Sequence, residues 1–123
     1  MPVKSFNSRV LKWPKKEEVH RSAEAWAQQI GEKFPGIVLI GYFGSYARDD
    51  WGVGSDLDMV IVVKGIVDDE LKKDVSLSLK RLPVPVDLLF YSIKEWSSLS
   101  NETRFGRMIK TETTWVYGYI KKL

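Results

Sequence analysis

Hydrophobic and polar residues alternate with a period that changes along the chain. Over residues 15–34 the apolar positions recur every three or four residues, which is the spacing of one helix face. This apolar stripe consists of Val19, Ala23, Trp26, Ile30 and Phe34. Pro35 and Gly36 follow directly and end the helix. We therefore expect an N-terminal arm over residues 1–14, followed by a long amphipathic helix.

Three short apolar segments have the pattern of strands, and they cover residues 37–43, 56–63 and 84–91. The segment from Asp68 to Leu82 is long enough for a crossover helix, with Asp68 as its candidate N-cap. Such a crossover makes the second and third strands parallel and adjacent. Shorter helices are expected over residues 93–96 and 103–109, and a last strand or extended tail over residues 113–119.

These elements predict an α/β (α+β) protein, with a small mixed β-sheet and flanking helices in a single domain over residues 1–123. The composition supports a compact enzyme-sized module, because 44% of the residues are hydrophobic. The absence of cysteine excludes disulfides, a thiol nucleophile and a thiolate zinc site. Without a long apolar run or a signal-peptide pattern, we expect a cytoplasmic protein that does not enter a membrane. The net charge of +3 is only weak evidence for nucleic-acid binding.

The first predicted strand stops at Gly44 and Ser45, and residues 46–48 can continue as a short helix. Glycine lets the backbone turn sharply and lets a ligand come close. The free N–H groups at a helix start suit phosphate oxygens. Ser45 can equally cap the helix, and capping is compatible with phosphate binding. This turn is therefore a candidate phosphate site.

Three aspartates stand among apolar residues of the second and third predicted strands: Asp56, Asp58 and Asp87. Residues two apart on a strand share a face, so Asp56 and Asp58 are expected to point the same way. Neighbouring strands about 4.8 Å apart would bring Asp87 to the same place. Such carboxylates repel one another unless a proton or cation relieves them, and their hard oxygens favour Mg²⁺ or Mn²⁺. The plainer alternatives are a strand cap for the pair and an edge-strand surface residue for Asp87.

Together, Gly44, Ser45, a spacer, Asp56, Asp58 and the later Asp87 resemble the signature of the DNA polymerase beta-like nucleotidyltransferases. More narrowly, residues 44–48 followed by residues 55–58 are similar to the minimal nucleotidyltransferases of bacteria and archaea, which are often encoded beside a HEPN-domain protein. The resemblance covers about residues 37–91. One residue departs from it, because Asp49 stands where the family often has glycine. This departure would bring a negative charge near the expected nucleotide site.

The resemblance implies the polymerase beta-like fold and a site for two Mg²⁺ ions, with Mn²⁺ as a substitute, held by Asp56, Asp58 and Asp87. It implies that ATP or another nucleoside triphosphate binds at Gly44, Ser45, Arg48 and Ser55. From the residues alone, Arg48 could also be an ordinary surface cation. Asp87 would in addition accept the proton of the attacking hydroxyl.

For function, the minimal family implies AMP transfer to a tyrosine of a HEPN-domain toxin, so this protein would be the antitoxin of a toxin–antitoxin pair. Two alternatives stay open. One is a non-catalytic nucleotide-binding module that neutralises its partner by masking it. The other is a nucleotidyltransferase that acts on a small molecule or an RNA as part of an oligomer. In the antitoxin hypothesis, nucleic acid is involved only indirectly, through the partner.

Residues 104–107 place two arginines around an aromatic ring and a glycine. This segment could contact a nucleotide or a partner protein. A C-terminal helix with solvated charges explains it more simply, and we favour that interpretation.

Overall fold

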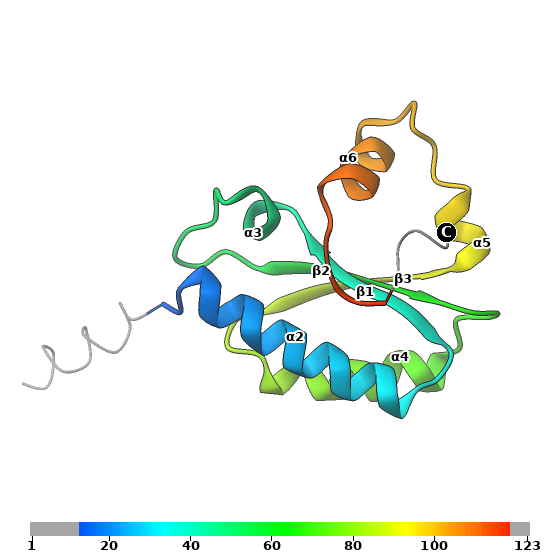
Figure 1. The fold of residues 1–123 in the computed structure, drawn as a ribbon, viewed down its shortest axis with the longest axis horizontal. Helices are drawn as coiled ribbons and strands as arrows, with labels where there is room; N and C mark the ends of the chain where they lie inside the picture. Colours follow the sequence, from blue (N-terminus) through cyan, green and yellow to red (C-terminus); the bar gives the residue numbers. More distant parts are fainter. Residues whose placement is uncertain (1–12, 119–123) are drawn as a thin grey trace, which may run out of the picture.

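A four-stranded mixed sheet forms the centre of the protein in this computed structural model, which describes residues 13–118 (Figure 1). The strands are β1 (Ile37–Phe43), β2 (Leu57–Val63), β3 (Val86–Ser92) and β4 (Thr114–Tyr117). Their order is β3-β2-β1-β4, and β1 runs antiparallel to both β2 and β4. Strand β2 is parallel to β3. The predicted pairings of the first three strands are thus confirmed.

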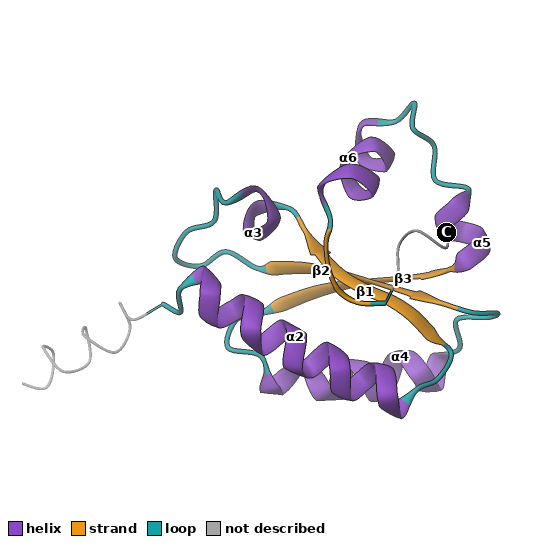
Figure 2. Cartoon of the chain, in the orientation of Figure 1, coloured by secondary structure: helices purple, strands orange, loops and turns teal. Residues whose placement is uncertain are grey.

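Helices cover both faces of this sheet. They are α2 (Lys16–Lys33), α3 (Ser45–Arg48), α4 (Asp69–Ser78), α5 (Ile93–Ser97) and α6 (Arg104–Glu112). Figure 2 shows α2 and α4 on one face and α5 and α6 on the other. The N-terminal arm expected over residues 1–14 falls almost wholly outside the described residues. None of the helices described here has the length and apolar character needed to cross a membrane.

The core between the sheet and the α2/α4 layer follows from the predicted helix stripe. Its α2 members are Val19, Ala23, Trp26, Ala27 and Ile30, each at most 3% exposed. They pack in one cluster with every second residue of β2, starting at Leu57 and Met59. The indole N–H of Trp26 donates to Ser78 Oγ on α4 at 2.7 Å. This bond satisfies the one polar group of the ring and joins the two helices.

The opposite face of the sheet carries a second core under α5 and α6. Its buried members are Leu39, Phe43, Val60, Val62, Trp96 and Ile109. Helix α6 contributes Ile109, and its Phe105 ring packs edge-on against Phe43 with the ring centroids 6.2 Å apart. Since Phe43 is the last residue of β1, α6 lies over the end of the sheet at which β1 finishes and β2 begins.

Strand β1 has the predicted bounds, whereas β2 and β3 begin slightly later than the apolar pattern predicts. Strand β2 begins at Leu57 instead of Asp56, and β3 begins at Val86 instead of residue 84. The pairing starts where the Leu57 N–H donates to the Pro85 carbonyl at 2.9 Å. Pro85 has no N–H of its own, so it cannot extend the ladder. As a result Asp56 lies in the loop before β2.

The crossover between β2 and β3 is a helix that is shorter than predicted. The Oδ1 atom of Asp68 accepts the Leu71 N–H at 2.8 Å, which confirms Asp68 as the N-cap. The α-helix ends at Ser78, and a 3-10 turn over Leu79–Arg81 follows. This crossover returns the chain to the edge of the sheet so that β3 starts beside β2.

Candidate active site

Asp58 and Asp87 lie directly opposite each other in the parallel pairing of β2 and β3. Both face α6, because Val60 and Leu89, two positions further along their strands, belong to the core layer under that helix. Asp56 precedes β2, so strand alternation does not place it, but its charge still acts on Asp58. The structure therefore brings Asp56 and Asp87 within electrostatic range of Asp58.

Burial and like charge together act on Asp58. Its partial burial raises the pKa of the carboxyl most, and the negative charges of Asp87 and Asp56 raise it further. The positive charge of Arg48 lowers the pKa of Asp58, but this effect is smaller than the others. Asp56 and Asp87 are exposed. A proton or a cation close to Asp58 would relieve this repulsion, so the site favours positive charge.

The donor chemistry of these carboxylates fits a hard divalent cation. Among the described residues, no group of three or more Asp, Glu or His side chains is arranged so that it could hold a metal ion by itself. Mg²⁺ often takes only one or two carboxylates and completes its shell with water and substrate phosphates. Asp58 and Asp87 suit an ion of that kind. Metal binding at these residues stays a prediction.

Gly44 places the predicted phosphate turn directly against Asp58. It holds the N-cap position of α3 with φ 76° and ψ −149°, a backbone conformation that is essentially restricted to glycine. A Cβ atom built on Gly44 would collide with Oδ2 of Asp58. The lack of a side chain is thus required both by the backbone and by the carboxylate, and it leaves the turn and the carboxylate in contact.

The two predicted serines have different surroundings. Ser45 is the first residue of α3 and is half-buried, but Gly44 holds the cap position without a side-chain capping bond. The idea that Ser45 caps this helix is therefore wrong. Ser55 closes a turn in the loop before Asp56, where its Oγ accepts the Gly52 N–H at 2.8 Å. The role of either serine in nucleotide binding stays a prediction.

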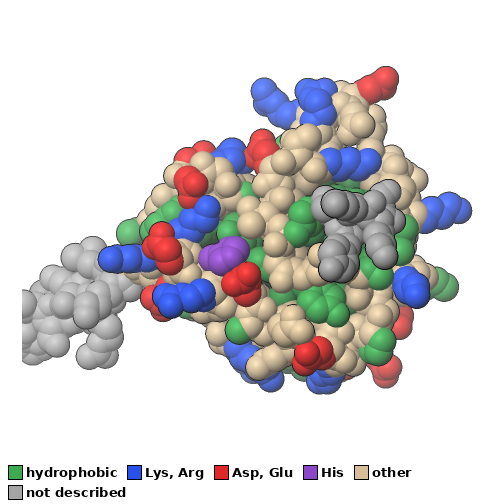
Figure 3. All heavy atoms as spheres, viewed as in Figure 1, with side chains coloured by type: hydrophobic (Ala, Val, Ile, Leu, Met, Phe, Trp, Pro, Cys, Tyr) green, Lys and Arg blue, Asp and Glu red, His purple; other side chains and the backbone are tan. Residues whose placement is uncertain are grey.

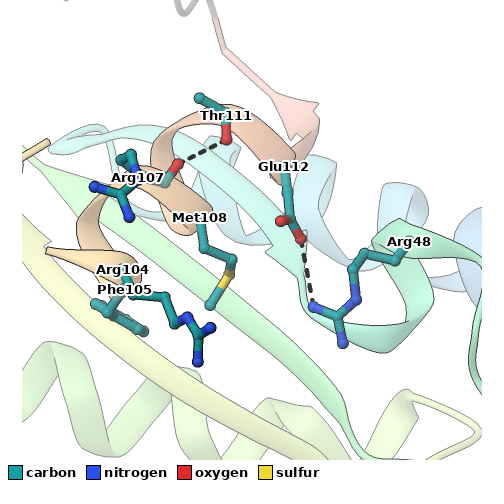
Figure 4. A pocket seen from close by; sticks show the side chains of 7 residues that line it. All are labelled: Arg48, Arg104, Phe105, Arg107, Met108, Thr111 and Glu112. Atoms are coloured by element: carbon teal, nitrogen blue, oxygen red, sulfur yellow. Dashed lines mark hydrogen bonds and ion pairs between the residues drawn. The ribbon is translucent and has the colours of Figure 1, made fainter.

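Arg48 joins α3 to α6. Its Nε donates to Asp50 at 3.1 Å, and its Nη1 donates to Glu112 on α6 at 3.4 Å (Figure 4). The guanidinium is exposed, and it is close enough to Asp58 to oppose the rise of that pKa. A phosphate that used Arg48 would have to share it with these two carboxylates.

Asp49 ends α3 in the left-handed region, with φ 65° and ψ 25°. Glycine adopts this conformation without strain, which gives a physical reason for glycine at this position. The Asp49 carboxylate accepts Lys16 Nζ of α2 at 2.6 Å and is not among the charges that act on Asp58. The Asp49 charge is thus paired with Lys16, and its effect on nucleotide binding stays a prediction.

A cleft of about 610 Å³ opens between Arg48 and α6, as Figure 4 shows. Its lining consists of Arg48, Arg104, Phe105, Arg107, Met108, Thr111 and Glu112. None of the three aspartates lines it, but Phe105 packs on Phe43, which pairs with Asp58 across β1 and β2. The cleft therefore lies beside the carboxylates.

Residues 104–107 begin α6 with Arg104 and Arg107 exposed, as the simpler interpretation expects, and the same residues also form one wall of the cleft. Arg104 and Arg107 are one helical turn apart and so share a face. That spacing, with an aromatic residue between them, was the signal available in the sequence. Figure 3 shows basic side chains gathered at the end of the molecule formed by α6 and the loop before it.

Comparison with known proteins agrees with this geometry. The family model described as nucleotidyltransferase domain matches residues 24–111, which is most of the chain. The chain therefore belongs to the nucleotidyltransferase domain family. No curated protein is similar enough to count as a match.

Solved structures show the same fold. A chain of a toxin–antitoxin complex with AMP-PNP is 20% identical with a TM-score of 0.60, over 80% of this chain and 76% of that one. A proposed nucleotidyltransferase from Sulfolobus solfataricus is 20% identical with a TM-score of 0.56, over 81% and 80% of the two chains. A chain of a complex of the tri-AMPylated HEPN toxin of Shewanella oneidensis with MNT antitoxin is 18% identical with a TM-score of 0.55, over 84% of this chain and 76% of that one. The polymerase beta-like fold predicted from the sequence is thus confirmed.

Proposed function

We propose that this protein is a Mg²⁺-dependent nucleotidyltransferase that moves AMP from ATP to a hydroxyl of a protein partner. The observation that supports this most directly is the placement of Asp58 opposite Asp87, with Oδ2 of Asp58 against the glycine turn at Gly44. Two opposed carboxylates beside a glycine turn are parts that nucleotide transfer needs, and the family match supports the reaction class.

In this proposal Asp56 and Asp58 hold the cation that binds the triphosphate, and Asp87 completes the site for the cation near the acceptor. When bound, the cations stabilise negative charge on the entering and leaving oxygens. The bare backbone at Gly44 lets phosphate oxygens approach, and the hydroxyls of Ser45 and Ser55 add hydrogen bonds to the nucleotide. Arg48 adds positive charge at the edge of the site.

The chemical step is an in-line displacement at the α-phosphorus of ATP. The acceptor hydroxyl loses its proton to Asp87, and its oxygen forms a new bond to the α-phosphorus. The bond between this phosphorus and the bridging oxygen breaks, and pyrophosphate leaves with the electron pair. AMP stays on the acceptor as a phosphodiester.

The partner that we propose is a HEPN-domain protein. The hydroxyl that receives AMP is that of a tyrosine of this partner. Support comes from the neighbours with the same fold, which include a toxin–antitoxin complex with AMP-PNP and a tri-AMPylated HEPN toxin with MNT antitoxin. In that role the protein would be the antitoxin and would silence its partner by modification.

The second candidate is a module that binds nucleotide and neutralises its partner by contact alone. Two observations favour it: no described group of three ligating side chains is arranged to hold a metal, and Arg48 is already paired with Asp50 and Glu112. In this alternative the aspartates would serve structure or nucleotide sensing.

The two candidates separate in a labelling experiment with ATP that carries label on the α-phosphate. The protein is incubated with Mg²⁺ or Mn²⁺, with and without its co-purified partner, and both chains are measured by intact mass. Nucleotide transfer predicts label on the partner and a mass increase of whole adenylyl groups, with loss of both in EDTA. A bound partner that stays unlabelled and unchanged in mass would contradict it.

A further inference from the structure

Helix α6 presents a compact surface that the nucleotide site does not use. We call it the α6 arginine face and define it by Arg104, Phe105, Arg107 and Met108, all of which line the cleft. The helix is fixed from below by Ile109, which is fully buried against the sheet. Thr103 Oγ1 accepts the Gly106 N–H at 3.0 Å and caps its start. The face is therefore carried on a rigid element.

The arginines of this face have no ion-pair partner in the part of the chain that the structure describes, whereas Arg48 across the cleft is paired twice. Arg107 donates only to the backbone carbonyls of Asn101 and Glu102, at 3.1 and 3.3 Å. These bonds orient the guanidinium without neutralising it. Two positive charges, of which that of Arg107 is oriented by these bonds, are thus available to a ligand.

An exposed aromatic residue stands between these two arginines in the sequence of α6. Phe105 is 41% exposed even though one edge packs on Phe43. Met108 stands next to it, between Arg104 and Arg48 in Figure 4. Aromatic residues, methionine and arginine are the types enriched in protein–protein interfaces. The open cleft and the half-exposed ring suit a docked protein segment better than an enclosed small molecule.

The face is also placed where an acceptor must arrive. Phe105 contacts Phe43, Phe43 pairs with Asp58, and Asp58 lies opposite Asp87. All of these residues are on the α6 side of the sheet. An acceptor hydroxyl that reaches Asp87 therefore brings its neighbouring residues close to α6.

We propose that the α6 arginine face is the docking surface for an acidic segment of the acceptor protein, next to the hydroxyl that receives the nucleotide. This inference rests on the proposed function for its identification of the occupant as the acceptor. Arg104 and Arg107 bind carboxylates of that segment, and Phe105 packs on its apolar or aromatic residue. The arginines also offset the repulsion between an acidic segment and the three aspartates.

A protein segment fits this face better than RNA. The two free arginines are one helical turn apart, and Glu112 closes the same cleft, so the positive surface is short. An RNA backbone gains affinity by contacting many phosphates in a row. A short acidic peptide needs only the two positions that α6 offers.

The test uses a random copolymer of glutamate and tyrosine as the acidic probe, and binding is followed by fluorescence anisotropy without nucleotide. A copolymer of lysine and tyrosine and an oligo-uridylate serve as the other probes. The variant is Arg104→Gln with Arg107→Gln. Its matched control is Lys72→Gln with Lys73→Gln, which removes the same charge from exposed positions of α4 on the opposite face of the sheet.

The parent and the α4 control should bind the acidic copolymer, and the α6 variant should bind it at least about tenfold more weakly. Phe105→Ala should also weaken binding of the acidic copolymer, and the salt dependence of this binding should stay as in the parent. Absence of copolymer binding by the parent, or equal binding by the α6 variant, would overturn the proposal. Tighter binding of oligo-uridylate that is lost in the same variant would overturn it in favour of a nucleic-acid surface.

This design tests the proposed docking surface and the proposed nucleotide transfer independently. Affinity for MgATP is measured for every variant and should stay at the parental value in the α6 variant. Asp87→Asn should bind the acidic copolymer at least as tightly as the parent does, because it leaves the α6 arginine face intact and removes one repelling charge. If the parent binds the copolymer but never transfers AMP to its natural partner, the proposed function fails while the docking surface stands.

Discussion

Oδ2 of Asp58 occupies the space that a side chain on Gly44 would fill. The phosphate turn and the central carboxylate are therefore one structural unit, although fourteen positions of sequence separate them. The positive φ of Gly44 and this contact act together, so any other residue at this position should destabilise the turn.

Gly44→Ala should lower the free energy of unfolding by about 1–3 kcal/mol, because alanine is strained at this backbone conformation and its Cβ displaces Asp58. Gly52→Ala is the control, since Gly52 lies in the next loop with no heavy atom within 4 Å of a Cβ added there. Urea denaturation of both variants measures the difference. Equal loss of stability in the two variants would show that the turn is not built around Asp58.

Asp58→Asn should make the metal-free protein more stable at neutral pH. The raised pKa means that the folded state holds a proton on Asp58 more tightly than the unfolded chain does, first through burial and then through Asp87 and Asp56. The stability from this group is fully present in acid and is lost as pH rises through the folded pKa. The advantage of the variant should thus appear in melts at neutral pH and vanish in acid.

The matched control for this titration is Asp74→Asn, at an exposed position of α4. It should not reproduce the pH dependence. Adding Mg²⁺ or Mn²⁺ with nucleotide should stabilise the parent more than Asp58→Asn, because the cation relieves the same repulsion. Parallel pH profiles for parent and Asp58→Asn would contradict the assignment.

Asp49 offers a test of backbone strain. Asp49→Gly loses the exposed ion pair with Lys16 but relieves the left-handed conformation, so its stability should stay near that of the parent. Asp49→Ala loses the pair and keeps the strain, and it should be less stable than Asp49→Gly by about 1 kcal/mol. Thermal melts of the two variants check the order. Nucleotide affinity should change little in either, because the charge points to α2.

Glu112→Gln tests whether Arg48 serves the nucleotide. This change removes one of the two carboxylates that hold the guanidinium. If Arg48 contacts phosphate, MgATP should bind roughly two- to fivefold more tightly, which corresponds to the free energy of one exposed ion pair. Titration calorimetry gives the affinity. An unchanged value would leave Arg48 as a surface cation that links α3 to α6.

The placement of Asp58 and Asp87 at one end of two neighbouring parallel strands was predictable, because strand periodicity and a crossover of the right length indicate it before any side chain is placed. The side-chain contacts around the site could not be predicted from the sequence. Lys16 meets Asp49 across 33 positions, and Arg48 meets Glu112 across 64. Such pairs depend on how helices settle on the sheet, which a local pattern does not encode. For the same reason the α6 wall of the cleft was missed.

The most direct test of the catalytic account is Asp87→Asn. The change is isosteric at an exposed position, so the fold and the contact with the partner should persist, and Asp56 and Asp58 should still bind MgATP at much of the parental affinity. Transfer of labelled AMP to the co-purified partner should fall to little or nothing, and the partner should regain its activity. If the Asp87→Asn protein restrains its partner as well as the parent does, the catalytic account is contradicted and masking by contact is the function.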